Sequence, residues 1–434
     1  MTLALILYAV LFAIVLFAPL RWSLIAYLVL STIDLGSMDA GIGVLNTAKA
    51  VLLPVYLLWR LRDYAGHGRI ILAPIAWSLL TVYAAVAAAW SFYPMFAIKL
   101  VGHMIALFLI CIVFMRATKS GHLTPAVVLP VAAGALILAA LRSIFAPAFG
   151  GEAERFKSFS SAQSFAAFLV ALYAIALCSK SPRLGVRLPL CGILIAALVF
   201  DGSRLWMLGL VLSTLVALLL SSAAPWIKVC TVGISAVVAT VTIAESDVVL
   251  TFLARQAPSN RIAAAIIAGY RGDSKSYGLG TYRLRRELDV RAVTAIGSSG
   301  IRELTCGRGT SNSAELAGGL ARKPDPNRIM HNEWLRVAYE WGITGMILWL
   351  MFFGSIALYA LQGLRKDEGG YSKPLLIYLP AFALGLAGEN IIAGAGNDVS
   401  AGFLLVIALA SISHRVTSQF RNVTPEQHMT HVAA

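Results

Sequence analysis

The stretch ILAPIAWSLLTVYAAVAAAWSFYPMFAIKLVGHMIALFLICIVFM, residues 71–115, contains a single charged side chain, Lys99. A helix that crosses a bilayer needs about 20 mostly apolar residues. The stretch holds two runs of that kind, 71–90 and 95–115, separated by a few polar and ring-bearing residues. We therefore expect two membrane-spanning helices that are joined by a tight turn.

The rest of the chain repeats this pattern. Of its 434 residues, 59% are hydrophobic and 13% are charged, and the mean hydropathy is +0.79. Soluble domains carry about 45–50% apolar and about 25% charged residues. This composition excludes a cytosolic enzyme, a coiled coil, a disordered chain and a secreted disulfide scaffold. The candidate spans are 41–60, 71–90, 95–115, 124–142, 162–178, 188–203, 205–221, 227–244, 333–360, 374–391 and 399–413.

The short loops orient these spans. If the eleven spans alternate, the lysines and arginines of the short loops all fall on one side, which the positive-inside rule makes cytoplasmic. Residues 3–37 contain two short apolar runs, divided at Pro19, and form either one further span or two. We favour one, which predicts an all-α polytopic membrane protein with about 12 transmembrane helices. The basic loop residues are Arg60, Arg62, Arg69, Arg116, Lys119, Lys180, Arg183, Arg187, Lys228, Arg365, Lys366, Lys373, Arg415 and Arg421.

The same topology divides the chain into four parts. They are an N-terminal transmembrane bundle (1–244), a large outer loop (245–332), C-terminal transmembrane helices (333–413) and a cytoplasmic tail (414–434). The loop carries thirteen Lys and Arg against eight Asp and Glu. The positive-inside rule does not govern so long a loop, so its charge favours an anionic ligand at the outer membrane face. A merely solvated loop explains the charge equally well.

Two arginines stand out at the outer face. Arg204 follows Asp201 in the charged turn DGSRLW between two apolar runs, where an unpaired arginine is costly. Pairing with Asp201 at a helix end is the alternative reading. Arg261 opens a half-apolar stretch of helical character, and its charge opposes the helix dipole unless an anion binds there. A surface charge on a loop helix is the alternative for Arg261.

A third place is HNEWLRVAYEWGITG, residues 331–345, where the large loop returns to the membrane. His331 is expected near the first turn of the returning helix, whose positive dipole end keeps an imidazole neutral and able to accept a proton. Glu340 is expected more than two turns deeper, where a carboxylate needs a partner. For His331 alone, a helix-capping role is the alternative.

In combination, these features resemble the O-antigen ligase and O-antigen polymerase family. The resemblance rests on SR-L-W at the start of one span, on an outer loop with an arginine-headed helix and Gly278-Leu279-Gly280, and on HN-x-x-L-x-x-x-x-E-x-G-x-x-G at the next span. The stretch RFKSF, residues 155–159, is similar to the first outer-loop motif of that family without its Gly and Asn-Pro pair. Leu205 stands where the family often has glycine. The resemblance covers roughly residues 150–360.

The resemblance implies a GT-C-like helical bundle that acts as a metal-independent glycosyltransferase without cofactors. It would work on the periplasmic face of the bacterial inner membrane and polymerise or ligate a surface polysaccharide, such as lipopolysaccharide or exopolysaccharide. The donor would be a glycan on undecaprenyl diphosphate, and the acceptor a hydroxyl of a saccharide or lipid A-core; nucleic acid is no partner. Two alternatives remain: a transporter or lipid-linked oligosaccharide flippase, with Lys49 and Lys99 as its ionisable residues, and a structural membrane subunit.

The resemblance also implies residue roles. Negative charge grows on the departing diphosphate, and without a metal ion arginines must stabilise it. Arg204 and Arg261 take that role, and His331 is the general base for the acceptor hydroxyl. Diphosphate or glycan binding is expected at Arg155, Lys157, Arg283, Arg285, Arg286 and Asn332, and an orienting role at Glu340 and Asp201.

Overall fold

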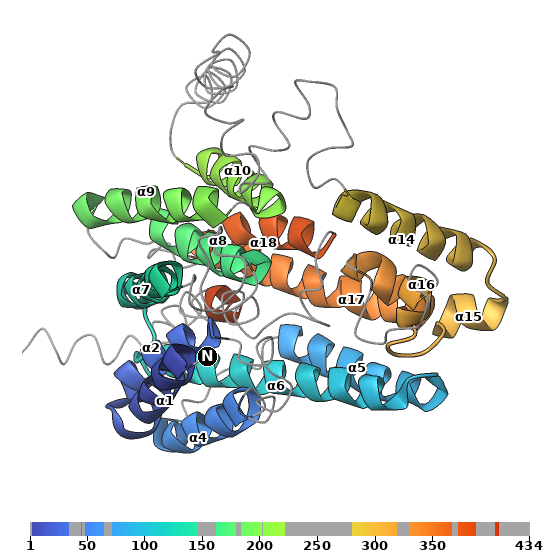
Figure 1. The fold of residues 1–434 in the computed structure, drawn as a ribbon, viewed down its shortest axis with the longest axis horizontal. Helices are drawn as coiled ribbons and strands as arrows, with labels where there is room; N and C mark the ends of the chain where they lie inside the picture. The colour runs from blue at the N-terminus through green and yellow to red at the C-terminus, as the bar shows by residue number, and fades with distance from the viewer. Residues whose placement is uncertain are drawn as a thin grey trace, which may run out of the picture.

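The computed structural model of the chain describes residues 2–33, 45, 48–64, 72–145, 162–178, 184–201, 203–221, 280–318, 330, 332–366, 372–387 and 404–407. Within these residues every regular element is a helix and there is no strand (Figure 1). The predicted all-α class is confirmed for this part of the chain.

Where the structure describes them, the helices occupy much the same residues as the predicted spans; the predicted span 227–244 lies outside the described residues, as does 399–413 except for residues 404–407. In the region 3–37, for which one or two spans were expected, the described residues form two helices that pack against each other, α1 and α2. The α-helices are α1 (Thr2–Phe17), α2 (Leu20–Ser31), α4 (Leu53–Arg60), α5 (Leu72–Ala87), α6 (Pro94–Lys119), α7 (Val128–Phe145), α8 (Ala162–Cys178), α9 (Leu184–Asp201), α10 (Arg204–Leu219), α14 (Gly280–Gly297), α15 (Ile301–Cys306), α16 (Ala314–Gly318), α17 (Glu333–Lys366) and α18 (Lys373–Leu386). Short π or 3₁₀ turns are η3 (Ala48–Leu52), η4 (Arg62–Tyr64), η5 (Ala88–Trp90) and η6 (Pro125–Val127).

The structure does not support twelve spans. Three helices of the described residues are long and apolar enough to cross a membrane: Pro94–Lys119, Pro125–Phe145 and Glu333–Leu364. Other apolar helices have only 10–17 residues. At about 1.5 Å per residue these extend over about 15–26 Å, less than the hydrocarbon core of about 30 Å. The apolar runs of the sequence thus form helices, but several of these helices are too short to cross the hydrocarbon core.

The outward surface of α17 is typical of a helix in contact with lipid. Its side chains at Ile343, Ile347, Leu350 and Leu358 are each about half exposed, at 49–56%. They recur at helical spacing and form one apolar face. A contiguous exposed apolar face of this kind is rare on soluble monomers, so the surface supports a membrane protein.

The interior is organised around α8. Every side chain from Ser164 to Ala176 is at most 4% exposed, because α7, α9, α10 and α18 pack around this helix. A second set of contacts joins α17 to α5 and α18, with the rings of Trp77 and Phe352 5.0 Å apart. The core is therefore continuous from α5 to α10 (Figure 1).

The predicted continuous span 333–360 is wrong in one respect, because α17 is broken at Gly342 (φ 61°, ψ −158°). The ring of Trp334 lies 6.1 Å from that of Trp349 and 5.3 Å from that of Phe353. In a straight helix these positions would be about 22 and 28 Å apart along the axis. The segment Glu333–Trp341 therefore folds back along the rest of α17, and we call it the re-entrant segment.

Beyond Gly342 the helix continues without a charged residue to Leu364. Its length there is about 33 Å, enough for the hydrocarbon core. Glu340 therefore lies beside the break and not two turns deeper in a continuous span, as the sequence had predicted. The physical reason is the positive φ of Gly342, which glycine adopts at little cost.

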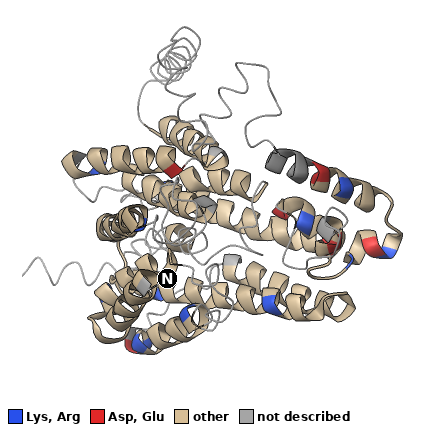
Figure 2. Cartoon of the chain, viewed as in Figure 1, with Lys and Arg blue, Asp and Glu red and all other residues tan. Residues whose placement is uncertain are grey.

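Helices α14, α15 and α16 fall within the predicted outer segment 245–332. They lie at one end of the bundle, beside α17 and beyond the α5–α6 turn (Figure 1). Charged residues gather on these helices and on the nearby part of α17, whereas the helical shafts are almost free of charge (Figure 2). The opposite end of α6 carries Arg116 and Lys119.

Candidate functional site

The helix break in α17 is capped by a loop from the preceding segment, GRGTSNS, residues 307–313, which we call the polar loop. A broken helix leaves carbonyl groups without their usual N–H partners. The N–H groups of Arg308 and Gly309 donate to the carbonyls of Tyr339 (3.1 Å) and Glu340 (2.9 Å). The hydroxyl of Tyr83, from α5, shares its one proton between the carbonyls of Cys306 (3.0 Å) and Trp341 (3.3 Å). Residues far apart in the sequence thus satisfy the freed carbonyls.

Two glycines allow this close approach. Gly307 has φ 77°, and a Cβ placed there would lie 2.2 Å from the carbonyl oxygen of Glu340. A Cβ on Gly342 would lie 2.6 Å from the backbone nitrogen of Gly307. The two backbones touch at this point, and both positions have the left-handed φ that favours glycine.

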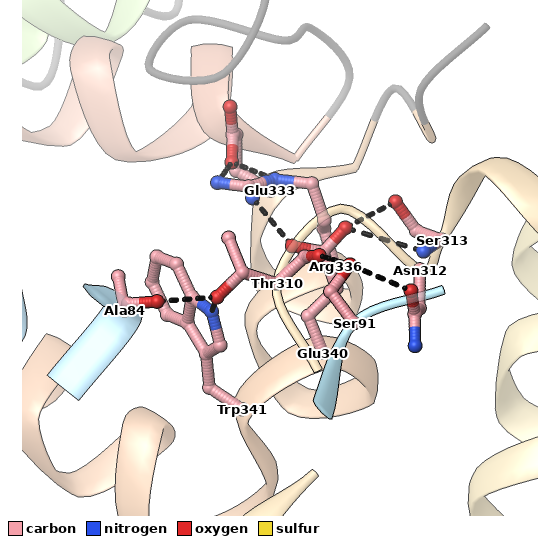
Figure 3. Close-up of polar contacts among 9 residues, drawn as sticks. All are labelled: Ala84, Ser91, Thr310, Asn312, Ser313, Glu333, Arg336, Glu340 and Trp341. Carbon is pink, nitrogen blue, oxygen red and sulfur yellow. Dashed lines mark hydrogen bonds and ion pairs between the residues drawn. The ribbon is translucent and has the colours of Figure 1, made fainter. Parts of the chain in front are cut away.

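A buried charge cluster lies on the re-entrant segment. The guanidinium of Arg336 lies between the carboxylates of Glu333 and Glu340 (Figure 3). Its Nε donates to Glu333 at 2.6 Å, and its Nη1 donates to Glu340 at 3.0 Å. All three side chains are 0% exposed. Charges are almost never buried in this way unless they are paired.

The cluster is tied to the polar loop through the other oxygen of Glu340. That oxygen accepts hydrogen bonds from the backbone N–H of Ser313 (3.2 Å) and from its hydroxyl (2.5 Å) (Figure 3). The Arg336 guanidinium also lies 5.3 Å from the ring centroid of Trp341, within range of a cation–π contact. Two carboxylates face one guanidinium, and the Ser313 donors help to balance the excess negative charge.

The polar loop is in turn anchored to the α5–α6 turn. The Thr310 hydroxyl donates to the carbonyl of Ala84 (2.7 Å) and accepts from the indole N–H of Trp341 (3.0 Å). The backbone N–H of Phe92 donates to the side-chain oxygen of Asn312 (2.9 Å). Thr310 and Asn312 are fully buried. One hydrogen-bonded network therefore connects α5, the polar loop and the re-entrant segment.

The rim of this network is more exposed. The guanidinium of Arg308 lies 2.7 Å from a carboxylate oxygen of Glu303 and 5.3 Å from the ring centroid of Tyr339. Burial raises the pKa of the Glu315 carboxyl on α16, and the positive charge of Arg308 offsets part of that rise. Arg308 thus supplies positive charge at the outer edge of the polar loop.

We expect Thr310→Val to destabilise the protein by about 1–3 kcal/mol, because it leaves the buried indole N–H of Trp341 without its acceptor and removes the hydrogen bond to the Ala84 carbonyl. The measurement is the melting temperature of the detergent-solubilised protein. Thr310→Ser keeps the hydroxyl and is the control, with a smaller expected loss. A Thr310→Val variant that melts at the wild-type temperature would show that the hydroxyl does not contribute to stability.

Of the predicted site residues, Glu340 has a described side chain on the re-entrant segment, and Asn332 has one directly before it. Asn332 precedes the first helical residue, and its side-chain oxygen accepts from the N–H of Leu335 at 3.2 Å, as a helix cap does. His331 lies outside the described residues. It is adjacent in the chain to Asn332 and to Met330, which is fully buried.

Asp201 and Arg204 lie at the junction of α9 and α10. Asp201 is the last residue of α9 and is fully buried, and Arg204 is the first residue of α10. The structure does not describe the Arg204 side chain. Ser203 and Trp206 are buried as well, at 7% and 1% exposure. Three residues of the predicted charged turn, Asp201, Ser203 and Trp206, are therefore buried.

Helix α10 and the re-entrant segment both contact α18 within residues 381–383. A Cβ on Gly209 of α10 would lie 3.2 Å from the Cβ of Ala381. The indole N–H of Trp334, on the re-entrant segment, donates to the carbonyl of Ala383 at 3.1 Å. Gly209 is less than two turns from Arg204, and Trp334 is three residues from His331. Two of the predicted motifs are thus brought to the same part of α18.

The remaining predicted residues are placed only in part. Arg283, Arg285 and Arg286 belong to the helical backbone of α14, which packs against α16 and α17, and their side chains are not described. Arg155, Lys157 and Arg261 lie outside the described residues.

Sequence reasoning gave no role to Arg336, Glu333 or the polar loop. A signal for the first two was present, because Glu333, Arg336 and Glu340 are spaced three and four residues apart and so share one face of a helix. The polar loop has a weaker signal, a run of small polar residues after Gly307 and Gly309 in an otherwise mixed segment. Its contact partners lie more than 200 residues away in α5 and could not be read from the sequence.

Among the described residues, no group of three or more His, Cys, Asp or Glu side chains could hold a metal ion. Comparison with protein-family models and with curated protein sequences finds no match to the chain.

Proposed function

We propose that this chain is a membrane glycosyltransferase of the O-antigen ligase or polymerase type. It transfers a glycan from undecaprenyl diphosphate to an acceptor hydroxyl at the periplasmic face of a bacterial inner membrane. The product is a surface polysaccharide, either polymerised or ligated to its final acceptor. The observation that carries the proposal is that α10, which begins at Arg204, and the re-entrant segment, which follows His331, both contact α18 within residues 381–383.

The shared contact with α18 matters because the reaction needs opposite kinds of group at one place. The bond from the anomeric carbon to the diphosphate breaks, and the departing oxygen gains negative charge that guanidinium groups stabilise. The acceptor hydroxyl loses a proton to a neutral base, for which an imidazole is suited near pH 7. In the proposal, Arg204 at the start of α10 faces the diphosphate, and His331, just before α17, takes the proton.

The outer segment supports the same reading. Helix α14 packs against α17 and carries Arg283, Arg285 and Arg286 in its first half. Positive charge at the end of an apolar bundle attracts an anionic lipid headgroup. In the proposal these arginines and Arg261 assist in binding the diphosphate, with Arg155 and Lys157 along the glycan. The lipid tail of the donor explains why the enzyme is embedded in a membrane.

One observation favours the alternative function, a transporter or flippase. Lys49 is 1% exposed within the π-helical turn η3, and its ammonium donates to the carbonyl of Ile33. Buried ionisable residues in apolar bundles are common in ion-coupled transporters, and π turns are frequent at functional sites. If the protein is a flippase, a host that lacks it should accumulate lipid-linked glycan on the cytoplasmic side of the membrane.

The test is to replace His331, Arg204 and Arg261 singly by alanine and express each variant in a host that lacks the gene. We expect loss of long glycan on gels, with lipid-linked oligosaccharide accumulating on the periplasmic side. Removal of a single oxyanion donor lowers catalytic rates by about 10²–10³-fold, so each arginine variant should make almost no product.

The control is Arg291→Ala, which removes an exposed arginine of α14 that pairs with Glu287, and which should leave the glycan unchanged. Protein levels are compared by immunoblot. Normal glycan in all three variants would contradict the catalytic assignment, and lipid accumulation on the cytoplasmic side would favour the flippase.

A further inference from the structure

The re-entrant segment must hold a fixed position if His331, two residues before its first residue, is to act as a base. Its amino-terminal end is bound to α18 through Trp334 and is capped by Asn332. Its carboxyl-terminal end is bound to the polar loop at Tyr339 and Glu340. Between these two ends lies the buried charge cluster of Glu333, Arg336 and Glu340.

Arg336 stiffens the segment from within. It is fully buried and binds both carboxylates, with Glu333 in the first turn and Glu340 in the last. Glu340 continues the connection to Ser313, and the polar loop carries it to Ala84 and Phe92 at the α5–α6 turn. The guanidinium is planar and its N–H donors point in fixed directions, so it fixes the orientation of the carboxylates that it binds as well as their distance. The network therefore runs without a gap from α5 to the residue that lies two positions after His331.

We propose that Arg336 is a positioning residue for His331: it connects the first turn of α17, through Glu340 and Ser313, to the α5–α6 turn. This inference rests on the proposed function. It differs from a purely folding role, because buried ion pairs contribute little net stability compared with apolar side chains of similar size. If the cluster serves to position His331, replacing it with neutral side chains should leave the protein able to fold but should lower its turnover.

The test compares a neutral triple variant, Arg336→Met with Glu333→Gln and Glu340→Gln, with the wild-type chain. The matched control is Arg291→Met with Glu287→Gln, which neutralises an exposed ion pair on α14. Turnover is the release of undecaprenyl diphosphate from native lipid-linked glycan, extracted from a host that lacks the gene. Binding is measured with undecaprenyl diphosphate alone. Folding is followed by size-exclusion chromatography, and the mobility of residues 332–341 by amide hydrogen exchange.

We expect the triple variant to fold and to bind undecaprenyl diphosphate as the wild type does. Its turnover should fall by about 100-fold, the loss that a misplacement of about 1 Å produces, and amide exchange should rise in residues 332–341. The control variant should match the wild type in all four measurements. Arg336→Lys, which keeps the charge and loses the fork, should give an intermediate rate.

Wild-type turnover in the triple variant overturns the inference, and so does a parallel loss of turnover and binding, which indicates a general folding defect. If the triple variant does not fold, Arg336→Lys decides: turnover at the wild-type rate overturns the inference, and reduced turnover with normal binding supports it. A wild-type chain that neither binds undecaprenyl diphosphate nor releases it contradicts the proposed function. In that case the exchange data still report whether the Arg336 cluster holds the segment in place.

Discussion

Arg336→Met as a single substitution should destabilise the protein by about 3–5 kcal/mol, the usual result of breaking a buried ion pair by removing one partner. The methionine fills most of the volume, but the carboxylates of Glu333 and Glu340 then remain buried without the guanidinium that they share. The measurement is the melting temperature of the detergent-solubilised protein, followed by fluorescence-detected size-exclusion chromatography after heating.

Two comparisons isolate the cause. The neutral triple variant should recover most of the lost stability, because it removes the unpaired charges together with the guanidinium. Arg291→Met removes an arginine whose ion pair with Glu287 is exposed, and exposed pairs contribute only about 0–1 kcal/mol. If Arg336→Met melts at the wild-type temperature, Glu333 and Glu340 are not held by Arg336 as the structure shows.

Gly307→Ala is expected to destabilise the protein by about 2–6 kcal/mol. A positive φ on a residue with a Cβ costs about 1–3 kcal/mol, and overpacking costs about as much again. The new Cβ would lie 2.2 Å from the oxygen and 2.4 Å from the carbon of the Glu340 carbonyl. These are backbone atoms, which cannot turn aside as a flexible side chain can. The polar loop would have to leave the break in α17.

The melting temperature again measures this effect, and hydrogen exchange at residues 339–342 should rise with it. The control is Gly297→Ala, at the end of α14, where a Cβ would meet no atom within 4 Å. Alanine there should be neutral or slightly stabilising, since it favours the helix over glycine. Similar melting temperatures for the two variants would argue against the tight contact between Gly307 and Glu340.

Much of the helical framework could be predicted from local sequence. The predicted span 162–178 coincides with α8, and the predicted spans 95–115 and 205–221 differ from α6 and α10 by a few residues. Such helices can be predicted because the length of an apolar run is a local property of the sequence. Whether each helix crosses a membrane was harder to predict, since a helix that ends a few residues early is too short to span the bilayer.

The candidate site was predictable only in part. Asn332 and Glu340 were singled out by their pattern; Glu340 lies on the re-entrant segment and Asn332 directly before it. Arg336 was given no role, although its spacing from both glutamates was visible in the sequence. Gly342 was included in a continuous predicted span, because a single glycine in a helical pattern does not indicate whether the helix breaks there.

The sequence by itself determined that the chain forms apolar helices, because each run of apolar residues satisfies its own backbone hydrogen bonds within a few turns. Only the tertiary structure decided that α17 folds back at Gly342. That choice depends on Tyr83 and on the polar loop, which lie respectively 258 and about 30 residues away from the carbonyls that they satisfy. A break in a helix is stable where distant partners replace the lost hydrogen bonds, and no local pattern records which partners those are.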